Sequence, residues 1–408
     1  MAISVHNCER SDLRSFLETG EAAFAEHVDD ADEARVNEIV EPHRMLLAKD
    51  GDLPVGASGA FRFELTVPGG ELPAAGVTLV GVIPSHRRQG VLTALMRKEL
   101  DDLRAWDEPL AVLWCSESSI YGRYGYGVAT RQATIDIEGN RAQFRNDSGR
   151  QGKLVMLSSD EALKSLPPVY ERVCAQTPGM YRRSAAWWKN HTLHDPPQRR
   201  DGDSPQWRVA LELEGRTEAF AIYRIHAKWG SEGLPTGHAR VIEVMGTSPV
   251  ATREIWRFLF SLDLVARIQA DAEPADTPLL TMLSEARRLR FLLQDGLWLR
   301  IVDIKKALEG RSYAVPGSLV LEVEDAFCSW NKGRWKLTSG QQGNVVERSD
   351  DRPDIMIDTA DLASTYLGGV SFGEINRAGA ATELTAGAME RADTMFRTER
   401  APWCPEMF

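Results

Sequence analysis

Several features that mark common protein classes are scarce or missing in this sequence. The 408 residues include five cysteines, which are scattered, odd in number and without C-x-x-C spacing. This pattern argues against a disulfide framework and a zinc site, and it indicates reduced thiols. The eight histidines stand singly, and no His/Glu pair has metal-ligand spacing. We therefore expect a cytoplasmic location and no bound metal.

The sequence also lacks a basic surplus, a secretion signal and a membrane segment. Its formal net charge is −11, whereas a general nucleic-acid-binding protein carries a basic domain. Residues 1–7 show no basic stretch followed by an apolar one, and no apolar run reaches the roughly 18 residues of a membrane helix. These absences predict a protein that binds neither nucleic acid nor membranes.

What is present is an ordinary globular composition that is long enough for two or three domains. The chain is 43% hydrophobic and 26% charged, which supplies enough apolar material for real cores. A polar, glycine-rich stretch at 141–152 predicts a first boundary, and a new strand-and-helix pattern begins at about 295. We expect domains at 1–150, 151–294 and 295–408.

Strand and helix patterns alternate along all three regions, which predicts mixed α/β sheets with crossover connections. The main strands are expected at 45–48, 54–65, 77–82, 110–115, 130–137, 154–157, 207–213, 219–225, 239–245, 319–323, 335–337 and 355–357. The main helices are expected at 13–24, 92–100, 251–264, 304–308, 359–366 and 384–398.

The most informative stretch runs from Val77 to Leu92. A buried strand leads into a turn with Arg87, Arg88 and Gly90, and a helix follows. The stretch contains neither G-x-x-x-x-G-K-[ST] nor G-x-G-x-x-G. Unpaired N–H groups and the dipole at a helix N-terminus attract an anion, and glycine allows a close approach. The turn is therefore typical of a pyrophosphate site, with a basic turn on any α/β surface as the alternative.

This turn resembles the acetyl-coenzyme A loop of GCN5-related N-acetyltransferases (GNAT), whose pattern is [QR]-x-x-G-x-[GA]. Arg87 and Gly90 match the pattern, whereas Leu92 departs from it at the last position. The strand at 239–245 is also followed by a turn and a helix, but that turn lacks paired arginines and a glycine at the helix entry. We expect a second, degenerate copy of the fold that holds no cofactor.

A second informative block runs from Trp114 to Gly127 and contains three tyrosines. A tyrosine hydroxyl, with an ordinary pKa of about 10, can protonate a departing thiolate. For Tyr124 and Tyr126, a packing role is the favoured interpretation. For Tyr121, packing and acid chemistry both stay open from the block alone.

Both blocks, together with Leu65–Gly69, Asp295–Arg300 and the terminal Phe408, resemble the Eis family of actinobacterial aminoglycoside-type N-acetyltransferases. The resemblance implies two GNAT folds, the second degenerate, followed by a sterol-carrier-protein-like domain, and assembly as a hexamer. It also implies an acetyl-CoA-dependent enzyme that acetylates amines of aminoglycosides, polyamines or lysines.

The resemblance also assigns site residues by their position in the family's motifs. The expected acetyl-CoA-binding residues are Val80, Gly81, Val82, Arg87, Arg88, Gln89, Gly90, Val91, Leu92, Thr93, Ser116 and Glu117. Tyr121 matches the general acid, and the α-carboxylate of Phe408 matches the general base. Burial would raise the pKa of a carboxylate and make it a better base. The proline- and aromatic-containing end of the chain favours a packed tail, with a frayed end as the alternative.

Glu26 and Glu406 are the expected substrate-binding residues, because acidic side chains attract an amine, although plain surface charges are equally typical. The position next to the family's last residue is commonly acidic, and here it is Met407.

Two alternatives stay open from the sequence. Cys115 would suggest transfer through a cysteine, but no cysteine lies in a nucleophile motif, so direct attack in a ternary complex is expected. The third region could instead bind a lipid or another hydrophobic ligand, with the acetyltransferase fold kept as a scaffold.

Overall fold

The computed structural model describes residues 3–25, 30–146 and 149–408, and it divides into two compact units. Unit 1 contains the described residues of 1–130 together with 296–399 and residue 408. Unit 2 contains the described residues of 131–295 and the tail residues 400–407.

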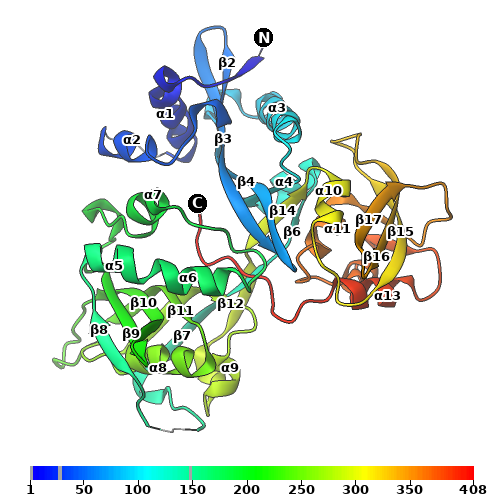
Figure 1. Cartoon of the computed structure of the whole chain (residues 1–408). Helices are drawn as coiled ribbons and strands as arrows, with labels where there is room; N and C mark the ends of the chain where they lie inside the picture. Colours follow the sequence, from blue (N-terminus) through cyan, green and yellow to red (C-terminus); the bar gives the residue numbers. More distant parts are fainter. Residues whose placement is uncertain (1–2, 26–29, 147–148) are drawn as a thin grey trace. The chain divides into compact units, whose positions relative to one another are not determined.

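Unit 1 contains a seven-stranded sheet among its described residues. Its strands lie in the order β1 (Ile3–Asn7), β2 (Met45–Asp50), β3 (Leu53–Val67), β4 (Gly70–Val82), β5 (Leu110–Trp114), β14 (Leu297–Ile301) and β6 (Tyr126–Val128). The pair β4 and β5 is parallel, and α3 (Val91–Ala105) connects the two strands along the chain. Helices α1 (Leu13–Phe24) and α3 flank β3 on opposite sides (Figure 1). This strand–helix–strand crossover was expected from the sequence.

Helix α1 forms because its apolar residues recur at helical spacing. Leu13, Phe16 and Leu17 are buried together against Met45 and Leu47 of β2. The helix begins after Asp12, as predicted, and ends at Ala25 in a left-handed conformation. Two shorter helices, α2 (Asp30–Val36) and α4 (Ser118–Tyr121), complete this part of unit 1.

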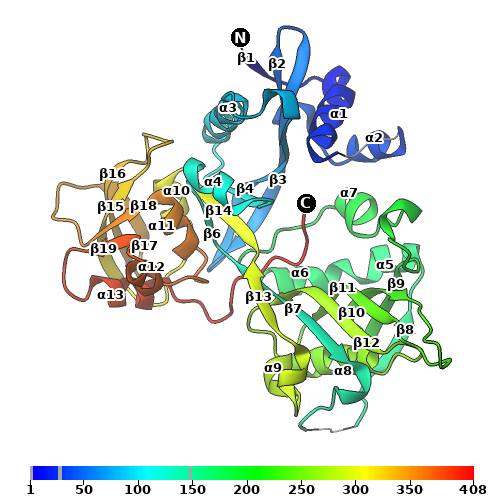
Figure 2. The ribbon, with the colours of Figure 1, turned by 180° about the vertical axis from the view of Figure 1, so that it is seen from behind.

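Two strands pair in sheets other than those of their sequence neighbours. The strand predicted at 130–137 is β7 (Arg131–Glu138), and it pairs in unit 2 with β12 (Arg267–Pro274) and β13 (Leu292–Asp295). Strand β14 instead enters the first sheet between β5 and β6, where Figure 2 shows it in yellow beside cyan β6. A local pattern identifies a strand, but its partner is decided by long-range burial.

Unit 2 is built on a second seven-stranded sheet. Its strands lie in the order β13, β7, β12, β11 (His238–Gly246), β10 (Arg216–His226), β9 (Trp207–Leu213) and β8 (Lys153–Met156). Helix α8 (Pro249–Phe260) connects the parallel strands β11 and β12, as α3 connects β4 and β5. Helices α5 (Ser159–Ser165) and α6 (Pro167–Cys174) lie on one face of the sheet, and α8 lies on the other (Figure 1).

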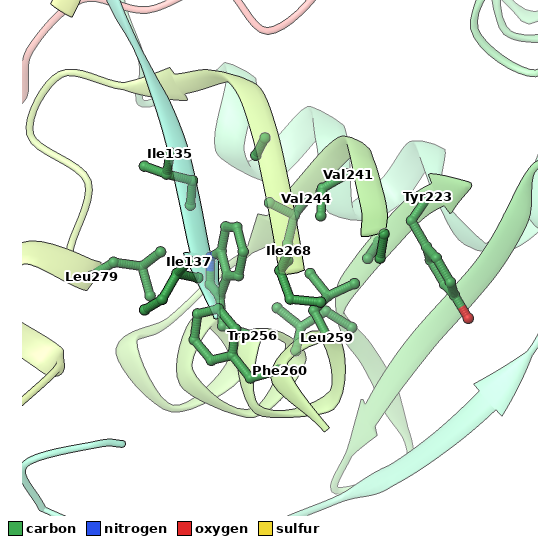
Figure 3. Close-up of a cluster of buried hydrophobic side chains, with 14 of the residues drawn as sticks. Ile135, Ile137, Tyr223, Val241, Val244, Trp256, Leu259, Phe260, Ile268 and Leu279 are labelled. Carbon is green, nitrogen blue, oxygen red and sulfur yellow. The ribbon is translucent and has the colours of Figure 1, made fainter. Parts of the chain in front are cut away.

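The main core of unit 2 lies between α8 and the sheet. Trp256 and Leu259 of α8 are buried with Ile137, Val241 and Ile268 of the strands (Figure 3). Short helices α7 (Ala185–Trp187) and α9 (Leu279–Met282) complete the unit.

The rest of unit 1 forms around a five-stranded sheet. Its strands lie in the order β17 (Gly343–Arg348), β16 (Gly333–Gly340), β15 (Gly317–Glu324), β18 (Ile355–Asp358) and β19 (Ala381–Glu383). The helices are α10 (Ile304–Glu309), α11 (Thr359–Thr365), α12 (Phe372–Arg377) and α13 (Ala388–Phe396).

Strand β14 joins the two sheets of unit 1 through a buried arginine. The fully buried Arg300 donates hydrogen bonds to Asp325 and to the hydroxyl of Thr359, at the start of α11. The same strand pairs with β5, so the first sheet and the third region share one hydrogen-bonded element.

None of the described helices is long and apolar enough to cross a bilayer. The described ranges also contain no group of three or more His, Cys, Asp or Glu side chains placed to hold a metal ion. The five cysteines are free thiols.

Candidate active site

Strands β4 and β5 part beyond Val77. Their parallel pairing covers Ala74–Val77 opposite Leu110–Leu113, whereas β4 continues to pair with β3 as far as Val82. A register shift in the β3–β4 pairing and a positive φ of 49° at Leu79 turn β4 away from β5. Residues 78–82 therefore present a strand edge toward β5 with which an extended chain can pair.

Helix α3 starts directly after this parted strand, and its first turn is open. Gly90 is the N-cap residue with a φ of 87°, and no side chain caps the helix. A Cβ atom on Gly90 would meet nothing within 4 Å. The first helical hydrogen bond runs from the Ala94 N–H to the Gly90 carbonyl, at 3.0 Å. The N–H groups of the first turn thus face open space, which is the arrangement that binds a pyrophosphate.

The two arginines of the turn have different roles. Arg87 donates to the Ala23 carbonyl at 2.9 Å and to the Val82 carbonyl at 3.2 Å, so it fastens the turn to α1 and β4. Arg88 has a left-handed φ of 62°, and its side chain is exposed. The structure therefore suits Arg88 for direct contact with an anion and Arg87 for holding the turn in shape.

Tyr121 ends helix α4 and is buried, with an exposed fraction of 5%. Its ring packs edge-on against Tyr126, with centroids 6.0 Å apart. Burial, followed by the nearby Cys115 and Glu99, raises the pKa of Tyr121 above its ordinary value. The phenol is therefore neutral over the working pH range and its hydroxyl can donate a proton.

The terminal Phe408 packs on β3. Its ring meets Phe63 edge-on with centroids 5.0 Å apart, and the Phe63 ring lies against Gly76 of β4. Side chains alternate between the two faces along a strand, so Phe63 and Gly76 lie on one face of the sheet and Val77 lies on the other. Val77 belongs to the same buried cluster as Tyr121. Phe408 and Tyr121 therefore lie on opposite faces of the sheet near the place where β4 and β5 part.

Three family models match successive parts of this chain. An acetyltransferase (GNAT) domain model matches residues 4–129, and a second acetyltransferase (GNAT) domain model matches residues 179–301. A sterol carrier protein domain model matches residues 304–405.

Whole-chain relatives agree with these matches. An uncharacterized N-acetyltransferase of Streptomyces avermitilis is 41% identical over 91% of this chain and 90% of its own. N-acetyltransferase Eis of Mycobacterium bovis is 30% identical over 93% of this chain and 92% of its own. The chain belongs to the Eis family of N-acetyltransferases. The crystal structure of Eis1 from Mycobacterium abscessus, 30% identical, superposes with a TM-score of 0.86 over 99% of this chain and 100% of that one.

Membership in the Eis family confirms three expectations from the sequence. The enzyme is an acetyltransferase, its fold combines two GNAT domains with a sterol-carrier-like domain, and its sheets are mixed α/β. The family resemblance read from the loop, the tyrosine block and the chain end is likewise confirmed.

In this Eis-family chain the tail packs into unit 2, and Glu406 anchors it. Four side chains donate hydrogen bonds to the carboxylate of Glu406: Tyr181 Oη at 2.9 Å, Trp187 Nε1 at 2.8 Å, His191 Nδ1 at 3.1 Å and Thr192 Oγ1 at 2.8 Å. Arg183 forms an ion pair with the same carboxylate, with its Nε 2.9 Å away. Burial by itself would raise the pKa of Glu406, but Arg183 and His191 outweigh it, and the pKa lies below the usual range. The carboxylate is therefore ionised and fully engaged.

This geometry gives Glu406 a role that the sequence did not suggest. Glu406 was expected to bind substrate, yet an amine would have to displace several of its protein donors. We expect the residue to hold the tail in place. Trp403 supports it, since its backbone N–H donates to the Pro178 carbonyl and its indole N–H to the Ala272 carbonyl, both at 2.8 Å. Glu26, the other predicted substrate residue, lies outside the described residues.

Sequence reasoning missed the partners that hold the chain end. Arg183, His191 and Phe63 are separated from their tail partners by more than 200 residues, and no local pattern signals such contacts. It also missed Glu99, which is buried on α3 and contributes to the raised pKa of Tyr121. A charged residue inside an apolar helix face was the available signal.

Proposed function

We propose that this enzyme transfers the acetyl group of acetyl-CoA to primary amines of small molecules, such as aminoglycosides, polyamines or lysine. The observation that carries the proposal is the parting of β4 and β5 beside the uncapped N-terminus of α3. Acetyl-CoA supplies an activated thioester when bound.

The donor site is formed by backbone on one side and an arginine on the other. The strand edge at Val80, Gly81 and Val82 pairs with the pantetheine arm, as an added strand would. The N–H groups from Gln89 to Thr93 and the Arg88 side chain hold the pyrophosphate. Ser116 and Glu117 are exposed just beyond β5, where we place the thiol end of the cofactor.

Proton transfer is divided between two groups on opposite faces of the sheet. The neutral Tyr121 hydroxyl donates its proton to the leaving sulfur, and the α-carboxylate of Phe408 accepts the proton of the attacking amine. Cys115 is half-buried, and we assign it no covalent role, so the amine attacks the thioester directly.

Shortening and extending the chain end tests the terminal carboxylate. Deleting Phe408, or adding one glycine after it, moves the carboxylate by about one residue, or roughly 3.4 Å. We expect acetyl transfer to fall by about 10²- to 10⁴-fold, the usual size of a lost general base, while acetyl-CoA binding is unchanged.

A matched variant separates the carboxylate from the ring. Phe408→Leu keeps the α-carboxylate and shortens only the side chain, so it should retain much more activity than the deletion. Full activity in the deleted or extended chain would show that the terminal carboxylate is not the base.

We further propose that the protein forms a homo-hexamer in the cytoplasm. Exposed apolar side chains on the edge strand β13, Leu292 and Leu293, support a contact between copies. The mass of the assembly in solution tests the hexamer. The domain limits proposed from the sequence, 1–150, 151–294 and 295–408, differ from the unit limits at 130 and 295, and limited proteolysis distinguishes the two divisions.

A further inference from the structure

Unit 2 contains a cavity of about 300 Å³ at the start of helix α8. Strand β11, the turn that follows it, the end of β12 and the tail enclose this space. Among its lining residues are Thr247, Ser248, Trp256, Glu273, Met282 and Trp403. Trp256 also belongs to the main core of the unit, where Figure 3 shows it beside Ile137. A volume of this size lies at the lower end of small-molecule sites.

The cavity is the counterpart of the donor cleft in unit 1. Strands β11 and β12 pair in parallel over His238–Val241 opposite Arg267–Ala270 and then part, while β11 continues to pair with β10 as far as Gly246. The parted end is followed by α8, as the parted end of β4 is followed by α3. The second GNAT fold thus keeps the cleft of the first.

The second cleft has lost the means to hold a pyrophosphate. The Ser248 hydroxyl caps α8 by accepting from the Ala251 N–H at 3.2 Å, and Pro249 has no N–H to offer. In α3 the corresponding turn begins with the uncapped Gly90. A ligand of the second cleft is therefore recognised by something other than phosphate.

Glu273 contributes a buried carboxyl to the lining of the cavity. Its exposed fraction is 5%, and its only hydrogen bond among the described residues is a long one, 3.3 Å, from the Thr277 hydroxyl. Burial raises the pKa of this carboxyl to about 8. A buried carboxyl with one weak partner costs free energy, and it lines an open space. An ammonium group in that space would give it the missing partner.

Two other titratable groups line the cavity, and both are engaged by the protein. Asp276 accepts from the Ala401 N–H at 2.9 Å, and Arg400 donates to the Gln176 side chain at 3.2 Å. Neither takes part in an ion pair with Glu273 among the described residues.

We propose that the cleft of the second GNAT fold binds a small organic amine, with its ammonium on Glu273 and its apolar body against Trp256 and Met282. This site goes beyond the catalytic function, because it lies wholly in unit 2 and needs no acetyl-CoA. It gives the degenerate fold a ligand in place of the cofactor it lost.

Binding of an amine to Glu273 should be accompanied by the release of a proton. At neutral pH the free carboxyl of Glu273 is protonated, so pairing with an ammonium ionises it and releases a proton. Calorimetry in buffers of different ionisation enthalpy should show about one proton released per bound amine near pH 7 and close to none above about pH 9.

The probes are 2-phenylethylamine and its alcohol, 2-phenylethanol, titrated into the full-length chain. We expect the amine to bind and the alcohol to bind at least tenfold more weakly. Glu273→Gln should remove one amine site per chain together with its proton release. Glu99→Gln is the matched control, since it replaces a buried carboxyl of similarly raised pKa in unit 1, and it should leave that site intact.

A second variant guards against misfolding of the first. Met282→Trp fills the cavity while keeping the carboxyl, and it should also remove the site. Amine bound only at the acceptor site would survive in both variants. The same number of bound amines in wild type, Glu273→Gln and Met282→Trp, or no binding at all, would overturn the proposal.

Discussion

At the scale of single residues, burial fixes the protonation state of the candidate acid. Tyr121 is kept neutral by burial, so it can give a proton but not accept one. Phe408 is half-buried, with its ring held by Phe63. We propose its α-carboxylate as the group that accepts a proton. The two groups therefore differ in the direction of proton transfer as well as in the face of the sheet they occupy.

Replacing one hydroxyl tests the acid. Tyr121→Phe should lower kcat by about 10²- to 10⁴-fold because the leaving sulfur loses its proton donor, while the Kd of acetyl-CoA stays the same. Tyr126→Phe is the control, because its buried hydroxyl has no hydrogen-bond partner in the described part of the chain. Steady-state kinetics with calorimetric binding measures both. Equal losses of kcat and cofactor affinity in Tyr121→Phe would indicate a structural role instead.

Glu99 makes stability depend on pH in the opposite sense to an ordinary carboxylate. The Ser58 hydroxyl donates to it at 3.0 Å, but burial raises its pKa to about 8. Its folded pKa exceeds the unfolded value, so its contribution is fully present below about pH 4.3 and is lost as the pH rises toward 8.

Glu99→Gln should therefore match wild type in unfolding temperature at about pH 4 and exceed it by several degrees at about pH 9. The amide keeps the acceptor for Ser58 and has no proton to lose. Thermal unfolding across this pH range checks the sign. A constant difference between the two proteins would show that Glu99 does not titrate in this window.

At the scale of elements, the turn between β4 and α3 combines a rigid part with an open part. Arg87 ties the turn to α1 and to its own strand, while Gly90 leaves the helix end bare. A close approach keeps the strand end against α1, because a Cβ on Gly81 would lie 2.6 Å from the Cβ of Ala23. The backbone donors of the turn are thus positioned before any ligand arrives.

Replacing Arg87 and Arg88 one at a time should change acetyl-CoA binding and unfolding temperature differently. Arg88→Ala should weaken acetyl-CoA binding by about 1.5–3 kcal/mol, the value of a charge-assisted hydrogen bond, with no change in unfolding temperature. Arg87→Ala should weaken binding and also lower the unfolding temperature, since it removes two hydrogen bonds to the main chain. Calorimetry and thermal unfolding distinguish the two, and an unchanged Kd in Arg88→Ala would remove it from the donor site.

At the scale of the whole molecule, the last nine residues run from unit 2 to the proposed base in unit 1. Residues 400–407 pack in unit 2, while Phe408 belongs to unit 1. Glu406 holds the tail in unit 2 through an ion pair with Arg183, which also pairs with Glu243. An ionised side chain thus lies two residues before the proposed base.

Loosening this anchor should reduce both stability and acetyl transfer. Glu406→Gln should lower the unfolding temperature by about 5 °C near neutral pH, because charged hydrogen bonds are replaced by neutral ones. The folded pKa is depressed, so the contribution is fully present above about pH 4.3 and fades as the pH falls below it. The difference from wild type should shrink accordingly.

A surface pair provides the control for this measurement. Glu322→Gln removes a partly exposed pair with Arg334 and should change the unfolding temperature little. If Glu406→Gln behaved like Glu322→Gln at every pH, the anchoring role would be wrong.

The sequence by itself determined the local elements, and its motifs predicted the donor site that we propose. Hydrophobic periodicity gave α1, β9 and the strand–turn–helix of the loop, because side-chain spacing is a local property. The residues of the donor loop and Tyr121 are close together in sequence, so a motif could identify them. The sequence also indicated that the second copy of the fold is degenerate, because the turn after its strand at 239–245 lacks the glycine and the paired arginines.

Only the tertiary structure decided which strands pair and what the tail does. Three features depend on contacts between residues far apart in the chain: the exchange of β7 and β14 between sheets, the four donors and the ion pair around Glu406, and the buried carboxyl of Glu273. Such contacts are selected by the burial of apolar surface and by the pairing of buried polar groups. Both are properties of the assembled core and leave no periodic trace in the sequence.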